Sequence, residues 1–152
     1  MNVDEYTLAV RSVLDGHTPS AVANLTTTLG CIPVKASRVI IKIFIDQDGE
    51  GFLGVRINLE GPDLYVLNKA IRPSAELFST KMIDGQLQPG LPLMEPHGES
   101  FSVHDALSDV AAQWIQEVWN LANHSDFSLP VFIETHDGYG TFTPLSLNHA
   151  IG

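Results

Sequence analysis

Residues 37–60 read SRVIIKIFIDQDGEGFLGVRINLE, and this stretch decides the fold. Its first part, residues 38–45, is almost wholly apolar and rich in β-branched side chains, which is typical of a buried strand. Its last part, residues 53–60, alternates apolar and polar residues, so a second strand with one buried face is expected. The acidic segment between them, residues 46–51, contains two glycines and predicts a turn. The stretch therefore predicts an antiparallel hairpin.

Three further segments are expected to extend this hairpin into a sheet. Residues 64–71, LYVLNKAI, follow the turn sequence EGPD and are interpreted as a third strand, which completes an antiparallel meander. Residues 75–83, AELFSTKMI, fit a fourth strand better than an irregular helix. Near the C-terminus, LPVFIET and TFTPLSL flank the turn HDGYG and predict a hairpin. Pro144 is expected to confine the last strand of this hairpin to a sheet edge or to an irregular stretch.

Apolar residues recur at helical spacing in three segments. The first lies between Asn2, a candidate N-cap, and Gly16, and the second begins after Thr18 and ends at Gly30. These two short helices follow each other closely and predict a helical hairpin. The longest helix, at about residues 103–122, carries a continuous apolar stripe. The stripe consists of Val103, Leu107, Val110, Trp114, Val118 and Leu121.

These elements predict one α+β domain spanning residues 1–152. It contains an antiparallel sheet of about five or six strands, with the two short N-terminal helices and the long helix packed on one face. A content of 44% apolar and 17% charged residues is typical of a globular chain, not of a disordered one. Residues 84–100 contain three prolines and three glycines and predict a long loop.

The charge balance restricts the possible partners. The chain has 18 acidic against 8 basic residues and a net charge of −10, so it should repel nucleic acid and anionic membranes and attract a basic protein. No apolar run approaches the ~20 residues that span a bilayer, and the first residues lack the basic start of a secretion signal, so a cytoplasmic protein is expected. The one cysteine, Cys31, cannot form an internal disulfide and is expected to be a buried thiol. A dimer is compatible with the sequence.

The acidic segment 46–51 raises the question of calcium binding. When a helix–loop–helix calcium loop is aligned at Asp46, the carboxylates of Asp46, Asp48 and Glu50 fall on the first three ligand positions. The twelfth position requires a bidentate glutamate but is Ile57, and both flanks are strand-like where helices are needed. We therefore expect no metal and no cofactor, and we interpret the segment as an acidic contact surface. The predicted partner-binding residues are Asp46, Asp48, Glu50, Glu60 and Asp63.

A second candidate site lies in the C-terminal turn. Glu134 and His136 are two residues apart and would share one face of a strand, as two metal ligands would. A third ligand could come from His97, His104 or Asp105, but nothing in the sequence shows that these residues meet. A polar hairpin turn is the simpler interpretation. The residues assigned to a possible ligand pocket are Arg56, Glu134, His136, Asp137 and Tyr139.

The motifs that the chain lacks favour a binding protein over an enzyme. It has no G-x-S-x-G turn for a serine nucleophile and no glycine-rich phosphate loop, and no catalytic residue is assigned. We expect a protein that acts by protein–protein interaction, such as an inhibitor or immunity-type protein against a basic partner. Two alternatives stay open: a dimeric accessory protein similar to secretion chaperones, and a small-ligand-binding domain or enzyme that uses the turn at Glu134, His136 and Asp137. Immunity proteins and secretion chaperones are two bacterial groups that resemble this chain only in size, charge and layout.

Overall fold

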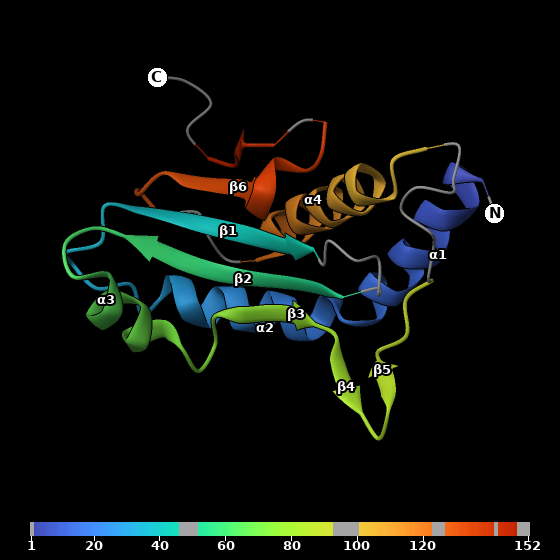
Figure 1. The fold of residues 1–152 in the computed structure, drawn as a ribbon. Coiled ribbons are helices and arrows are strands. Elements are labelled where there is room, and N and C mark those ends of the chain that lie inside the picture. The colour runs from blue at the N-terminus through green and yellow to red at the C-terminus, as the bar shows by residue number, and fades with distance from the viewer. Residues whose placement is uncertain (1, 46–51, 93–100, 123–126, 142, 149–152) are drawn as a thin grey trace.

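The computed structural model describes residues 2–45, 52–92, 101–122, 127–141 and 143–148. Within these residues, four α-helices pack on a five-stranded, mostly antiparallel sheet, and a small two-stranded sheet lies apart from it (Figure 1). The predicted α+β class is confirmed. In chain order, the elements are α1 (Val3–Gly16), α2 (Thr18–Leu29), β1 (Arg38–Ile45), β2 (Leu53–Glu60), α3 (Leu64–Ile71), β3 (Glu76–Ser79), β4 (Lys81–Ile83), β5 (Gln86–Gln88), α4 (Val103–Leu121), β6 (Val131–Thr135), the 3₁₀ turn η1 (His136–Gly138) and β7 (Leu145–Ser146).

The large sheet has the strand order β3-β2-β1-β6-β7. β1 and β2 form the predicted antiparallel hairpin, with Arg38 opposite Glu60 at one end. β1 also pairs with β6, and this pair is parallel, with Lys42 opposite Glu134. The sequence predicts an antiparallel sheet, and the structure differs in this one parallel pair. Because parallel strands point the same way, β1 and β6 end at the same edge of the sheet.

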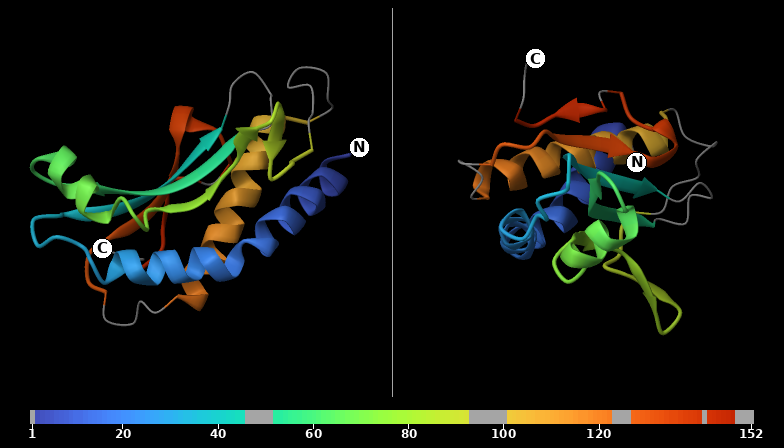
Figure 2. Two further views of the ribbon diagram at one scale, coloured as in Figure 1. Left: turned by 90° about the horizontal axis from the view of Figure 1, so that it is seen from below. Right: turned by 90° about the vertical axis from the view of Figure 1, so that its left-hand side faces the viewer.

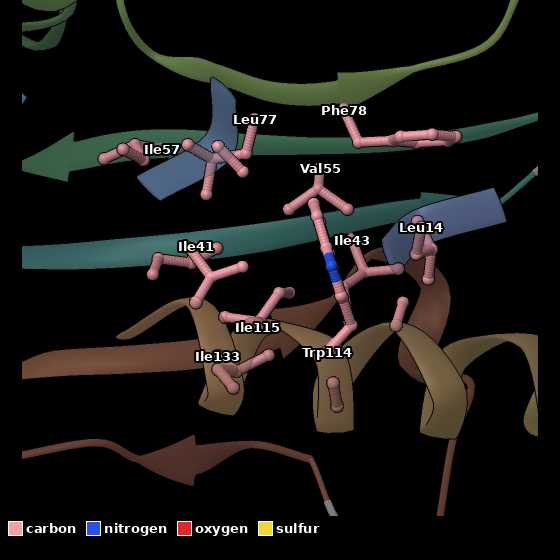
Figure 3. Packing of buried hydrophobic residues seen from close by; sticks show 14 of the residues in the cluster. Leu14, Ile41, Ile43, Val55, Ile57, Leu77, Phe78, Trp114, Ile115 and Ile133 are labelled. Atoms are coloured by element: carbon pink, nitrogen blue, oxygen red, sulfur yellow. The ribbon is translucent and has the colours of Figure 1, made fainter. Parts of the chain in front are cut away.

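The core lies between one face of this sheet and the helices. Alternate residues of β1 and β2, among them Ile41 and Val55, point to this face and are buried (Figure 3). From the helix side, α4 contributes Trp114 and Ile115, which are both fully buried. The Trp114 indole N–H donates to Thr18 Oγ1 at 2.9 Å, so its polar atom is paired within the core. The predicted long helix is confirmed as α4.

The first two helices begin and end close to the predicted residues. Asn2 Oδ1 accepts a hydrogen bond from the Glu5 backbone N–H at 2.8 Å, and Glu5 accepts one from the Asn2 backbone, so α1 starts with a capping box. The predicted helical hairpin is wrong. Only His17 separates α1 from α2, and one residue is too short to reverse the chain, so the helices follow each other end to end with a bend (Figure 2).

Residues 64–71 form the helix α3, so the predicted third strand is wrong at this position. Asp63 has a φ of 60°, and its side chain accepts from the Val66 backbone N–H at 3.5 Å, which starts a helix. Leu67 and Ile71, four residues apart, are the buried residues of α3. The meander does exist, but its third strand is β3, which pairs with β2 in antiparallel fashion.

The predicted fourth strand is confirmed as strand, although it is divided between two sheets. Its first half is β3, and its second half is β4, which pairs with β5 in a hairpin that projects from the body (Figure 1). Residues 86–88 were expected to belong to the loop 84–100, but they form β5. Residues 93–100 of that loop lie outside the described residues. The predicted C-terminal hairpin is present, because β6 and β7 pair antiparallel.

The structure bears on two expectations from the composition, the burial of Cys31 and the lack of a membrane-spanning helix. Cys31 is exposed, so the predicted buried thiol is wrong, because the residue follows the end of α2 at Gly30 and lies in the turn beyond it. None of the helices within the described residues combines the length and the hydropathy needed to cross a membrane.

Candidate functional site

Because β1 and β6 are parallel, the end of β1 that precedes segment 46–51 in the sequence lies at the same end of the sheet as the turn after β6. β1 ends at Ile45, where the acidic segment 46–51 begins, and β6 ends beside Glu134, His136 and Asp137. A hollow of about 320 Å³ is lined by residues of both regions, including Ile45, Phe52 and His136. The segment 46–51 itself, with Asp46, Asp48 and Glu50, lies outside the described residues. We call this part of the molecule the acidic end; it comprises segment 46–51, its neighbours Ile45 and Phe52, and Glu134, His136 and Asp137.

A second hollow at the acidic end, of about 230 Å³, contains three of the five predicted pocket residues. They are Glu134, His136 and Asp137, and His136 Nε2 lies 3.6 Å from Asp137 Oδ1. Lys42 also lines this hollow, because it lies opposite Glu134 in the parallel register. Sequence reasoning missed Lys42. The alternation of β1 shows that its side chain points away from the core, but only the pairing with β6 places it beside Glu134.

The other two predicted pocket residues do not line this hollow, although Arg56 lies opposite Lys42 across β1 and β2. Arg56 is on β2 and lines a different hollow, where its guanidinium is 3.7 Å from the Glu76 carboxylate. The Tyr139 ring packs against His104, with 4.6 Å between the ring centroids. His104 Nε2 is buried and has no hydrogen-bond partner among the described residues. The structure therefore does not join the five residues into one pocket.

The loop after β6 is held against α4 by side-chain hydrogen bonds to its backbone. Asp105 Oδ1 accepts from the Gly140 N–H, and Asp109 Oδ1 accepts from the Thr141 N–H, each at 2.8 Å. Below them, Ser108 Oγ is fully buried and lies 2.6 Å from Thr135 Oγ1. Asp105 was considered as a metal ligand, but its carboxylate holds the loop that carries the acidic end.

A comparison with protein families places the chain. Residues 1–149 match the model of a family of unknown function, DUF6389. The chain belongs to this family. The comparisons with curated proteins and with solved structures gave no match. The match to DUF6389 includes every residue of the acidic end.

The remaining predicted partner-binding residues of this DUF6389 protein lie at the other end of β2. Glu60 forms an ion pair with Arg38, and Asp63 is the N-cap of α3. At roughly 3.4 Å per residue, the length of β2 separates them from segment 46–51 by more than 20 Å. The structure thus does not place Glu60 and Asp63 beside Asp46, Asp48 and Glu50, and both residues have contacts within the chain.

The described polar residues of the acidic end in this DUF6389 protein, Glu134, His136 and Asp137, are at least partly exposed. Among the described residues, no three histidine, cysteine, aspartate or glutamate side chains are close enough to hold a metal ion. His136 and Asp137 are exposed, and Glu134 is half-buried. Exposed carboxylates keep their hydration and act on a partner over several ångströms, so they suit the attraction of a positively charged protein.

Proposed function

We propose that this protein acts by binding another protein through its acidic end, as an inhibitor or immunity-type protein with a basic partner. The parallel register of β1 and β6 supports this proposal, because Ile45 and Phe52, which flank segment 46–51 in the sequence, lie at the end of the sheet that also carries Glu134 and Asp137. We infer that the acidic residues of the segment, Asp46, Asp48 and Glu50, act together with Glu134 and Asp137.

Electrostatics supports a basic partner. The chain has a net charge of −10, and among the described residues Lys42 is the one lysine or arginine that lines the two hollows of the acidic end. Such a surface raises the association rate of an oppositely charged protein and lowers that of nucleic acid. The cytoplasmic location expected from the sequence stays a prediction.

A small-ligand site is the second candidate function. Glu134, His136, Asp137 and Lys42 line one hollow, so an anionic group could meet Lys42 while a hydroxyl or amine meets a carboxylate. The chaperone-like alternative has less support. It needs a continuous apolar groove, whereas the large exposed apolar residues of the described chain include two separate groups, one on α3 and one on β4 (Figure 1).

The proposal is tested by two matched triple variants. The first, Asp46→Asn, Asp48→Asn and Glu50→Gln, neutralises the segment at the acidic end. The second, Glu60→Gln, Asp63→Asn and Asp84→Asn, removes the same charge elsewhere while retaining side chains that accept hydrogen bonds. Tagged wild-type protein and both variants are used to capture partners from the lysate of the native cell at low and moderate salt, with identification by mass spectrometry.

We expect the wild type to retain a basic partner that dissociates as salt rises. The first variant should recover about tenfold less of it, and the second should recover it as the wild type does. Equal capture by both variants would contradict the proposal. Loss of partner capture with the second variant alone would indicate that the partner contacts the region of Glu60, Asp63 and Asp84 instead. An empty wild-type capture under conditions where basic proteins are detected would favour the small-ligand candidate.

A further inference from the structure

The end of the molecule that carries α3 has the opposite charge to the rest of the chain. Residues 35–38 and 56–76 contain five basic residues and three acidic ones, although the whole chain has 8 basic and 18 acidic residues. The five basic residues are Lys35, Arg38, Arg56, Lys69 and Arg72. A basic region within a strongly acidic protein does not follow from the need for solubility, because the net charge of −10 already provides that.

Two of these arginines line one hollow between β2 and α3. It has a volume of about 290 Å³, and Arg56 and Arg72 lie on its wall together with Asn58. Arg56 is 3.7 Å from Glu76, and Glu76 is also 3.4 Å from Lys81, so one carboxylate serves two cations. Within the described residues, Arg72 has no ion pair with a carboxylate. Both guanidinium groups therefore keep donors for an added carboxylate.

An exposed apolar surface adjoins this hollow. Leu64, Tyr65 and Val66 are consecutive and are 56%, 66% and 56% exposed. Arg72 connects the two features, because its guanidinium lies 6.0 Å from the centre of the Tyr65 ring and also lines the hollow. Lys69 lies 5.9 Å from the same ring. Three consecutive exposed apolar residues are unusual on a protein surface unless they contact a partner.

We propose that α3 and the adjoining hollow form a docking surface for an acidic segment of a partner protein that also contains apolar residues. Carboxylates of the segment pair with Arg56 and Arg72, and its apolar side chains cover Leu64, Tyr65 and Val66. We infer this occupant from charge complementarity, since the surface has cationic side chains beside the exposed apolar residues of α3. Arg56 lies opposite Lys42 across β1 and β2, so the docking surface is not far from the acidic end. It attracts a segment of the opposite charge and uses different residues, so it is tested independently of the function proposed above.

The test uses two short fluorescein-labelled peptides, one in which glutamate alternates with leucine and one in which lysine replaces glutamate. Their binding to the full chain is measured by fluorescence anisotropy at low salt. The variant Arg56→Gln with Arg72→Gln removes both guanidinium groups of the hollow. The control, Arg11→Gln, removes a guanidinium from α1 and is compared with the single variant Arg72→Gln, which removes the same charge from the hollow. A further variant, Tyr65→Ser, removes the exposed ring, and circular dichroism checks that each variant is folded.

We expect the glutamate peptide to bind the wild type and the control alike. The arginine variant should weaken this binding about tenfold, and Tyr65→Ser should weaken it by a smaller factor. No binding of the glutamate peptide, or equal binding by the arginine variant and the wild type, would overturn the proposal. Sedimentation velocity tests whether a second copy of the chain occupies the docking surface. A wild-type dimer that the arginine variant abolishes would show that a second copy of the chain, through its acidic end, covers the surface instead.

Discussion

The two ends of the sheet differ in the residues that they carry, and we propose partners of opposite charge for them. At the acidic end, β6 and the turn after it carry Glu134 and Asp137, beside the strand β1 that precedes the acidic segment 46–51 in the sequence. At the α3 end, arginines gather around a hollow beside exposed apolar residues. The net charge of −10 describes only the average of these two surfaces.

The two ends are also fastened to the domain by different chemistry. At the α3 end, the Asn68 amide donates to the Leu59 carbonyl at 3.2 Å and accepts from the Leu59 N–H at 2.8 Å, so it pairs with β2 as a neighbouring strand would. At the acidic end, the carboxylates of Asp105 and Asp109 accept from the loop backbone. In each case a side chain completes backbone hydrogen bonds, and this holds a surface segment in place.

The largest expected effect is that of Gly61→Ala at the α3 end. Gly61 has a φ of +149°, and an added Cβ would lie 2.7 Å from the Lys35 carbonyl oxygen and 3.0 Å from Leu67 Cδ1. Because a backbone atom cannot easily move away, we expect a loss of roughly 2–4 kcal/mol in unfolding free energy, measured by urea denaturation. Gly85→Ala is the control, since its φ is +79° but no atom lies within 4 Å of the added Cβ. Equal losses of unfolding free energy in the two variants would show that the close contacts around Gly61 do not contribute to the effect.

Gly140→Ala should have a somewhat smaller effect at the acidic end. An added Cβ would lie 2.6 Å from Ser108 Oγ at a φ of +104°, and the contacted atom belongs to a side chain that can be removed. We expect a loss of roughly 1–3 kcal/mol, which the further change Ser108→Ala partly reverses. Gly138→Ala has a φ of +76° with open space around it and reports backbone strain alone. Strict additivity of Gly140→Ala and Ser108→Ala would contradict the predicted contact.

Asn68→Ala should loosen α3 without affecting the acidic end. It leaves the N–H and the carbonyl of Leu59 without their side-chain partners, so a loss of roughly 1–2 kcal/mol is expected. Hydrogen exchange should increase at Leu59 and in α3 but not in β6. Asn68→Asp keeps the acceptor and loses the donor, so it should lie between wild type and alanine. Increased exchange at both ends would mean that the two ends open together.

The smallest effect concerns the helical layer that both ends share. Burial raises the pKa of Tyr6 in α1 to about 12, because the phenolate would lose its hydration. Below pH 10 the tyrosine is protonated in both states and stability is unaffected. Between pH 10 and about 12 the unfolded chain releases the proton and the folded chain keeps it, so stability falls with rising pH. At pH 11 the wild type should lose about 1 kcal/mol more than Tyr6→Phe. Equal alkaline losses would contradict the raised pKa.

The parts of the fold with a clear period could be predicted from the sequence. The alternation in residues 53–60 and the stripe of α4 give β2 and α4 almost to the residue. α3 was misread as a strand because LYVLNKAI is largely apolar in composition. The spacing of four between its buried residues Leu67 and Ile71, after a possible N-cap at Asp63, was the available signal.

The parallel pairing of β1 with β6 could not be predicted, and the candidate sites depend on it. The register depends on packing between strands that are about 90 residues apart, which no local pattern encodes. The sequence therefore indicated segment 46–51 and the turn at Glu134 and His136 as two unrelated sites. Lys42 and Arg72 were missed for the same reason, since each acquires its neighbours only through long-range contacts.

The central claim is that the two ends attract partners of opposite charge, and amide chemical shifts test it most directly. The ¹⁵N-labelled protein is titrated separately with the lysine–leucine and the glutamate–leucine peptides at low salt. The account predicts that the lysine peptide shifts amides around Ile45, Phe52 and His136, and that the glutamate peptide shifts those of α3 and Arg56. Overlapping sets of shifted amides, or lysine-peptide shifts centred on α3, would contradict it.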